Sequence, residues 1–75
     1  MTTAESVRDL AIDLVRSDTE RGEAVEELEQ VCGGRRVAAV RARQMIASSL
    51  EEEVDEPEKQ EAMTLLDDLL TRLPA

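Results

Sequence analysis

Four arginines lie close together in the stretch CGGRRVAAVRARQM, residues 32–45, and no acidic residue separates them. They are Arg35, Arg36, Arg41 and Arg43. A basic helix after a glycine turn is typical of a helix-turn-helix, in which the second helix enters the major groove of DNA. The alternative is structural. In that case the arginines pair with acids on neighbouring helices, or cover apolar surface with their aliphatic stems.

The residues around the two glycines disfavour DNA binding. A helix-turn-helix needs a small residue four positions before the turn glycine and an apolar residue directly after it. With Gly33 as the turn, these positions hold Glu29 and Gly34. With Gly34 as the turn, they hold Gln30 and Arg35, so neither register fits.

Charge also argues against a nucleic-acid partner. The 75 residues include 9 basic and 18 acidic side chains, for a net charge of −9. Residues 31–50 carry four arginines and no acid, whereas the segments on either side each carry nine acids. Those flanking acids would repel phosphates within a Debye length, about 8 Å at physiological salt. We therefore expect the arginines to serve the fold or to meet an acidic protein partner.

No residue pattern indicates catalysis. The chain has no histidine, and Cys32 is its single thiol. Cys32 lies at the predicted C-terminal end of a helix, where the dipole disfavours a thiolate. Its spacing with Leu28 and Val31 predicts a buried core residue instead. The acidic run at residues 51–58 lacks the turn glycine of a calcium loop, and CGGRR lacks the spacing of a phosphate loop. We expect no enzyme activity, cofactor, metal site or small-molecule substrate.

In size, acidity and helix number the chain resembles an acyl carrier protein. Those proteins carry Asp-Ser-Leu at the start of the second helix, where the serine takes the phosphopantetheine arm. Here the nearest analogue is GRRV at residues 34–37, which has no serine, and Ser48 and Ser49 lie late in a predicted helix. We therefore do not assign the chain to that family.

Hydrophobic periodicity predicts four helices, at about residues 4–16, 19–32, 35–53 and 57–73. The expected caps are Thr2 or Thr3 for the first helix, Ser17, Asp18 or Thr19 for the second, and Asp55 or Glu56, followed by Pro57, for the fourth. Gly33 and Gly34 should end the second helix. No strand pattern is present. We expect an all-α fold, a compact bundle of four short helices joined by short turns, in one domain over residues 1–75.

The third predicted helix is apolar around most of its circumference. Its polar stripe is confined to Arg41, Gln44 and Ser48. A helix of this kind is usually the central, most buried one. We therefore expect helix 35–53 to lie at the centre of the bundle.

Self-association is expected because the core should be weak. The chain has no aromatic residue and cannot form an internal disulfide, so its core should be worth only about 3–5 kcal/mol. The fourth helix has an apolar arc of roughly 160°, wider than a surface helix requires. We expect a homodimer through this helix, with or without a contribution from the first. The candidate partner-binding residues are Ile12, Val37, Leu65, Leu69, Arg36, Arg41 and Arg43.

The sequence is best interpreted as a small acidic helical protein–protein interaction module of the adaptor, antitoxin or immunity, or inhibitor type. Its partner would be another protein, a second copy, or both. The second hypothesis is a DNA-binding transcriptional regulator that uses the basic helix 35–47. No apolar run exceeds four residues, and the N-terminus lacks the basic region of a signal peptide. We therefore expect a cytoplasmic protein without a membrane span.

Overall fold

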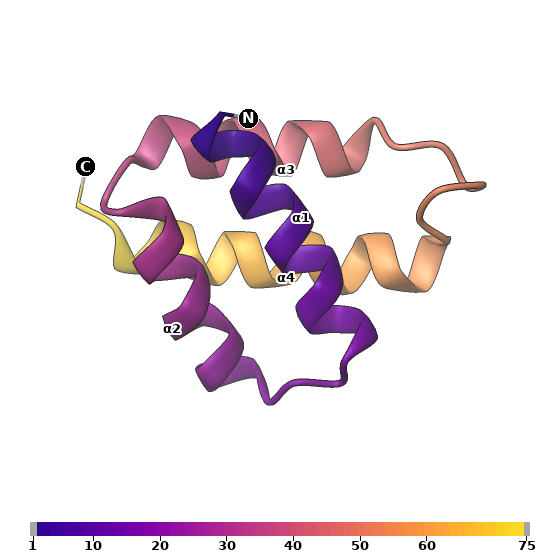
Figure 1. The fold of residues 1–75 in the computed structure, drawn as a ribbon, viewed down its shortest axis with the longest axis horizontal. Helices are drawn as coiled ribbons and strands as arrows, with labels where there is room; N and C mark the ends of the chain where they lie inside the picture. The colour runs from indigo at the N-terminus through magenta and orange to yellow at the C-terminus, as the bar shows by residue number, and fades with distance from the viewer. Residues whose placement is uncertain (1, 75) are drawn as a thin grey trace.

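The computed structural model describes residues 2 to 74, and within them the chain forms four α-helices and no strand. They are α1 (Thr3–Arg16), α2 (Arg21–Cys32), α3 (Arg36–Ala47) and α4 (Glu56–Arg72). α3 and α4 run side by side in opposite directions, and α1 and α2 pack across them (Figure 1). This arrangement confirms the expected all-α bundle of four short helices.

Two helices begin with a reciprocal cap. The Thr2 hydroxyl accepts a hydrogen bond from the Glu5 N–H, and the Glu5 carboxylate accepts one from the Thr2 N–H. Asp55 and Glu58 repeat this pattern at the start of α4, with Pro57 in the first turn. Each pair satisfies backbone donors that a helix start leaves without partners. The predicted capping roles of Thr2 and Asp55 are confirmed.

The start of α2 differs from the prediction. The helix begins at Arg21 rather than at residue 19, and its N-cap is Glu20, whose carboxylate accepts from the Gly22 N–H at 3.3 Å. The reason lies in the preceding turn. Asp18 has a left-handed φ of 55°, and the Thr19 N–H still bonds to the carbonyl of Leu14 in α1. The helical bonding of α2 therefore starts with the Ala24 N–H, which bonds to the carbonyl of Glu20. The predicted end at Cys32 is confirmed, because Gly33 takes the left-handed conformation there.

α3 ends six residues earlier than predicted, at Ala47 instead of residue 53. The Ser49 hydroxyl bonds to the carbonyl of Met45, and Lys59 of α4 donates to the carbonyl of Ser49 at 2.9 Å. Three successive glutamates follow at residues 51–53, where the negative end of a helix dipole disfavours acids. Residues 50–54 instead form a turn that brings Val54 back into the interior.

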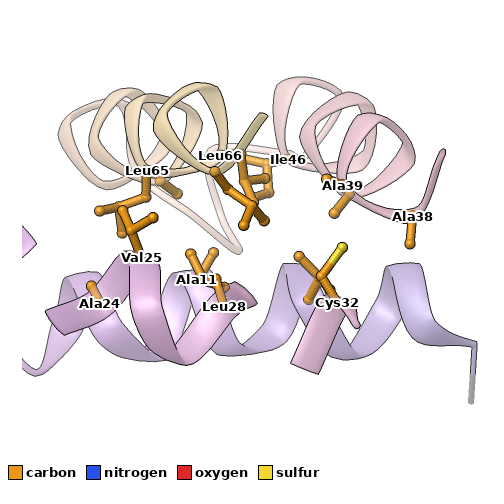
Figure 2. Packing of buried hydrophobic residues seen from close by; sticks show 14 of the residues in the cluster. Ala11, Ala24, Val25, Leu28, Cys32, Ala38, Ala39, Ile46, Leu65 and Leu66 are labelled. Atoms are coloured by element: carbon orange, nitrogen blue, oxygen red, sulfur yellow. The ribbon is translucent and has the colours of Figure 1, made fainter. Parts of the chain in front are cut away.

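The core lies between the α1–α2 layer and the α3–α4 layer. Side chains from α1 and α2 point towards Ile46 of α3 and towards Leu65 and Leu66 of α4 (Figure 2). Alanines on every helix allow the backbones to approach closely. Cys32 is 1% exposed and belongs to this core, as predicted. No polar or charged side chain among residues 2–74 is buried, which fits the general cost of burying such groups.

The expectation that the third helix is the central one is wrong. α3 packs on α1 and α4 and touches α2 only slightly, so part of its circumference remains on the surface. Val37 is 71% exposed, and Val40 is also exposed. Of its apolar residues, Ala38, Ala39, Ala42 and Ile46 are buried. Apolar residues around most of a helix therefore do not mark its central position here.

α4 packs against all three other helices. Its wide apolar arc is filled inside the bundle. Leu65 is 7% exposed and Leu69 is fully buried, while Ile12 of α1 is half-buried against the core. The prediction that Leu65 and Leu69 form a partner-binding surface is therefore wrong. The exposed large apolar residues are Val31 of α2, Val37 and Val40 of α3, and Leu50 in the turn that follows α3.

No helix within residues 2–74 has the length and apolarity needed to cross a lipid bilayer.

Candidate functional site

The exposed side of α3 forms one continuous face without a carboxylate. We define the outer face of α3 as Val37, Val40, Arg41, Gln44 and Ser48, which are all exposed. Their spacing of three or four residues places them on one side of the helix. The whole of α3 contains no acidic residue. This face therefore differs in charge from the rest of a molecule whose net charge is −9.

A hollow of about 450 Å³ lies at one end of this face, where the start of α1 meets the start of α3. We call it the basic hollow; it is lined by Thr2, Thr3, Ala4, Arg35, Arg36, Val37, Ala38 and Arg41. The lining contains three arginines and no carboxylate, and it is largely apolar between them. Val37 is the most exposed large apolar side chain in the lining of the hollow.

Two arginines of the hollow are held by neighbouring groups. Arg35 Nη1 donates to the Thr3 hydroxyl at 3.4 Å. Arg36 Nη1 donates to the carbonyl of Leu70 on α4 at 2.9 Å. The Arg41 side chain forms no hydrogen bond or ion pair with any residue from 2 to 74. Its guanidinium is therefore the one in the hollow that keeps all its donors for another molecule.

Arg43 lies outside the hollow and has a structural partner. Its Nε is 2.7 Å from Oδ1 of Asp67 on α4, and a second nitrogen lies 3.4 Å from Oδ2. This ion pair and the hydrogen bond from Arg36 to Leu70 both join α3 to α4. The four arginines thus do not share one open face: three line the basic hollow, and the fourth is neutralised by an acid of α4.

The start of α3 adds positive character to the hollow. Its N-cap is Arg35, and no side chain accepts a hydrogen bond from the first turn. Unpaired N–H groups at a helix start behave as a partial positive charge. The backbone and the three guanidinium groups therefore favour the same kind of partner, one that carries negative charge.

A second feature lies at the opposite end of α3. Leu50 is 64% exposed, and Glu51, Glu52 and Glu53 follow it on the surface. We call residues 50–54 the Leu50 turn. Sequence analysis missed this feature because it extended the helix to residue 53. The large apolar residue followed directly by three acids is the signal that could have found it.

The Leu50 turn is held by hydrogen bonds within it and by side chains of α1 and α4. The N–H groups of Glu53 and Val54 bond to the carbonyl of Leu50 at 2.9 and 3.1 Å. Arg16 of α1 donates to the carbonyl of Glu53 at 2.8 Å. Lys59 of α4 holds the residue before the turn, and Val54 anchors its end in the core. Leu50 is therefore exposed on a turn whose backbone is held by hydrogen bonds.

The thiol, the acidic side chains and a second hollow are less suited to catalysis or ligand binding. The Cys32 thiol lies 3.1 Å from the carbonyl of Arg35 and is closed off from solvent. No cluster of three possible metal ligands occurs among residues 2–74. A hollow of about 280 Å³ lies between the end of α1 and α4, floored by Leu14 and Leu65. Typical small-molecule sites begin at about 300 Å³ and enclose most of the ligand.

Comparisons with protein families, with curated proteins and with solved structures find no match to this chain.

Proposed function

We propose that the chain is a protein–protein interaction module, and that the outer face of α3 with the basic hollow is its docking surface. The observation that carries the proposal is Val37, which is 71% exposed between Arg36 and Arg41. Protein interfaces commonly combine an apolar centre with a charged rim, and arginine is enriched in them.

The charge distribution supports an acidic partner. Residues 31–50 carry four arginines and no acid, and of these arginines only Arg43 is paired with a carboxylate within residues 2–74. A partner with an apolar residue for Val37 and carboxylates for Arg41 and its neighbours would match the surface. Complementary charge of this kind speeds association and selects partners more than it adds affinity.

DNA binding is the second candidate, because Arg41 and Gln44 are exposed one turn apart on the same helix. These side-chain types can read guanine and adenine in the major groove. Two features weigh against it. Binding duplex DNA draws most of its affinity from several phosphate contacts, whereas the outer face carries two valines and a single arginine. The net charge of −9 also repels the duplex.

Capture from the native host tests the docking surface. The immobilised baits are wild type, Val37→Glu, Arg41→Glu and the control Val31→Glu. Val31 is an exposed valine of α2 outside the outer face, so its substitution adds the same charge as Val37→Glu at another place. We expect a partner that wild type and Val31→Glu retain and that both α3 variants lose. Equal capture by all four baits would contradict the proposed surface.

A titration with random and genomic duplexes addresses the second candidate. We expect no binding at physiological salt. Tight, salt-sensitive binding that disappears with Arg41→Ala would instead favour the regulator.

A further inference from the structure

We propose that a second copy of this chain occupies the basic hollow, and that the occupying segment is its Leu50 turn. The inference rests on the proposed docking surface and names one partner for it. The result is head-to-tail association, in which each chain offers the hollow at one end and the turn at the other.

The two surfaces complement one another in charge and in apolar content. The hollow presents Val37, 71% exposed, among three arginines. The turn presents Leu50, 64% exposed, beside three glutamates. Joining them would bury the two most exposed large apolar side chains of the described residues and would oppose three positive to three negative charges. Burial of apolar area and charge complementarity therefore act together.

Their positions exclude pairing within one chain. The start of α3 and the Leu50 turn lie at opposite ends of the α3 helix (Figure 1). Twelve helical residues separate them by roughly 18 Å along the axis. The Leu50 turn of one chain can therefore contact the basic hollow of another copy only.

Both surfaces are ordered before they meet. The turn is held by Arg16, Lys59 and the buried Val54. In the hollow, Arg35 and Arg36 are held by Thr3 and by the carbonyl of Leu70. Binding between preformed surfaces avoids much of the entropy lost when loops and long side chains become ordered.

The alternative of a two-fold contact between outer faces is less favourable. Such a contact uses the same patch on both subunits, so it would bring positively charged faces together. Head-to-tail contacts use two different patches and leave one of each unoccupied, which allows chains or rings. The net charge of −9 on each copy opposes growth, so association should depend strongly on concentration.

The experiment uses one variant for each surface. The hollow variant is Val37→Glu with Arg41→Glu, and the turn variant is Leu50→Glu. The control is Val31→Glu. All four positions are exposed, so thermal melts should stay close to wild type. Sedimentation velocity and light scattering measure mass from micromolar to millimolar concentration.

We expect wild type and Val31→Glu to exceed twice the 8.3 kDa mass of one chain as concentration rises. Each surface variant alone should remain monomeric. A 1:1 mixture of the two variants retains one intact hollow and one intact turn per pair. It should therefore reach twice the monomer mass and stop there.

Three results would overturn the inference: a monomeric wild type at millimolar concentration, association of either variant alone as in wild type, or a mixture that stays monomeric while wild type associates. The proposed function has a separate readout. If wild type is monomeric but captures a partner that the Val37→Glu bait loses, self-association fails and the docking surface stands. If the variant mixture dimerises and the capture baits do not differ, self-association stands, and the hollow takes a second copy of this chain rather than another protein of the host.

Discussion

Arg16 at the end of α1 and Glu58 at the start of α4 form an ion pair across the bundle, with Nε 3.0 Å from Oε2. The same guanidinium donates to the carbonyl of Glu53, so one side chain joins α1, the Leu50 turn and α4. The hydrogen bond from Arg16 lowers the pKa of Glu58, and the bond to Glu58 raises the pKa of Arg16. This ion pair therefore stabilises the bundle and also helps to hold the Leu50 turn in place.

The Arg16–Glu58 pair should make stability depend on pH. Because the pKa of Glu58 is lowered from 4.5 on folding, its contribution is present above pH 4.5 and is lost as the pH falls through the lowered value. Urea unfolding of wild type and Glu58→Gln from pH 7 to pH 3 checks this. The difference between the two proteins should be largest at pH 7 and should shrink in acid.

Comparison with a matched variant separates this effect from general charge repulsion. Glu26→Gln removes an exposed acid of α2 that makes no ion pair with residues 2–74. It should leave the pH dependence close to that of wild type. If Glu58→Gln and Glu26→Gln behave alike, the pair does not control acid stability.

Leu69 and Val37 should respond in opposite ways to truncation. Leu69 is fully buried on α4, so Leu69→Ala should cost about 2–5 kcal/mol and should leave most chains unfolded. Val37→Ala changes an exposed residue and should alter the free energy of unfolding by less than about 0.5 kcal/mol. Circular dichroism with urea measures both. A stable, cooperatively folding Leu69→Ala protein would contradict the described core.

Two glycines provide a test of backbone conformation. Gly33 has a φ of +62° and open space where a Cβ would lie, so Gly33→Ala suffers backbone strain alone and should lose about 1–2 kcal/mol. Gly22 lies in the first turn of α2, where a Cβ would meet only the flexible Glu20 carboxylate at 3.2 Å. Gly22→Ala should therefore be neutral or stabilising by up to about 1 kcal/mol. Urea midpoints that change in the reverse order would show that α2 does not end as described.

Cys32 should react slowly with thiol reagents in the native protein. Its side chain is 1% exposed, so labelling requires local or global opening. The rate with a chromogenic disulfide should rise by at least an order of magnitude in denaturant. Similar rates in both conditions would place the thiol at the surface and would reopen a covalent role.

Local chemistry determined the elements of this fold. In two helix caps the side chain of each residue accepts a hydrogen bond from the backbone N–H of the other, three positions away: Thr2 with Glu5, and Asp55 with Glu58. Gly33 takes the left-handed conformation at the end of α2 without the strain that a side chain would cause. Apolar spacing of three and four residues also identified Cys32 as a core residue. These features depend on neighbours along the chain, so the sequence alone contains them.

The tertiary structure decided which apolar faces are buried. The sequence shows that α3 is apolar around most of its circumference and that α4 has a wide arc, but it does not show how many helices touch each one. α4 packs its apolar side on all three other helices, so Leu65 and Leu69 are internal, whereas the outer side of α3 leaves Val37 open to solvent. Likewise, only the fold brings Asp67 to Arg43 and leaves Arg41 without a partner among residues 2–74. Periodicity within one helix indicates which side is apolar, but contacts between segments far apart in the chain decide which apolar sides are covered and which charges pair.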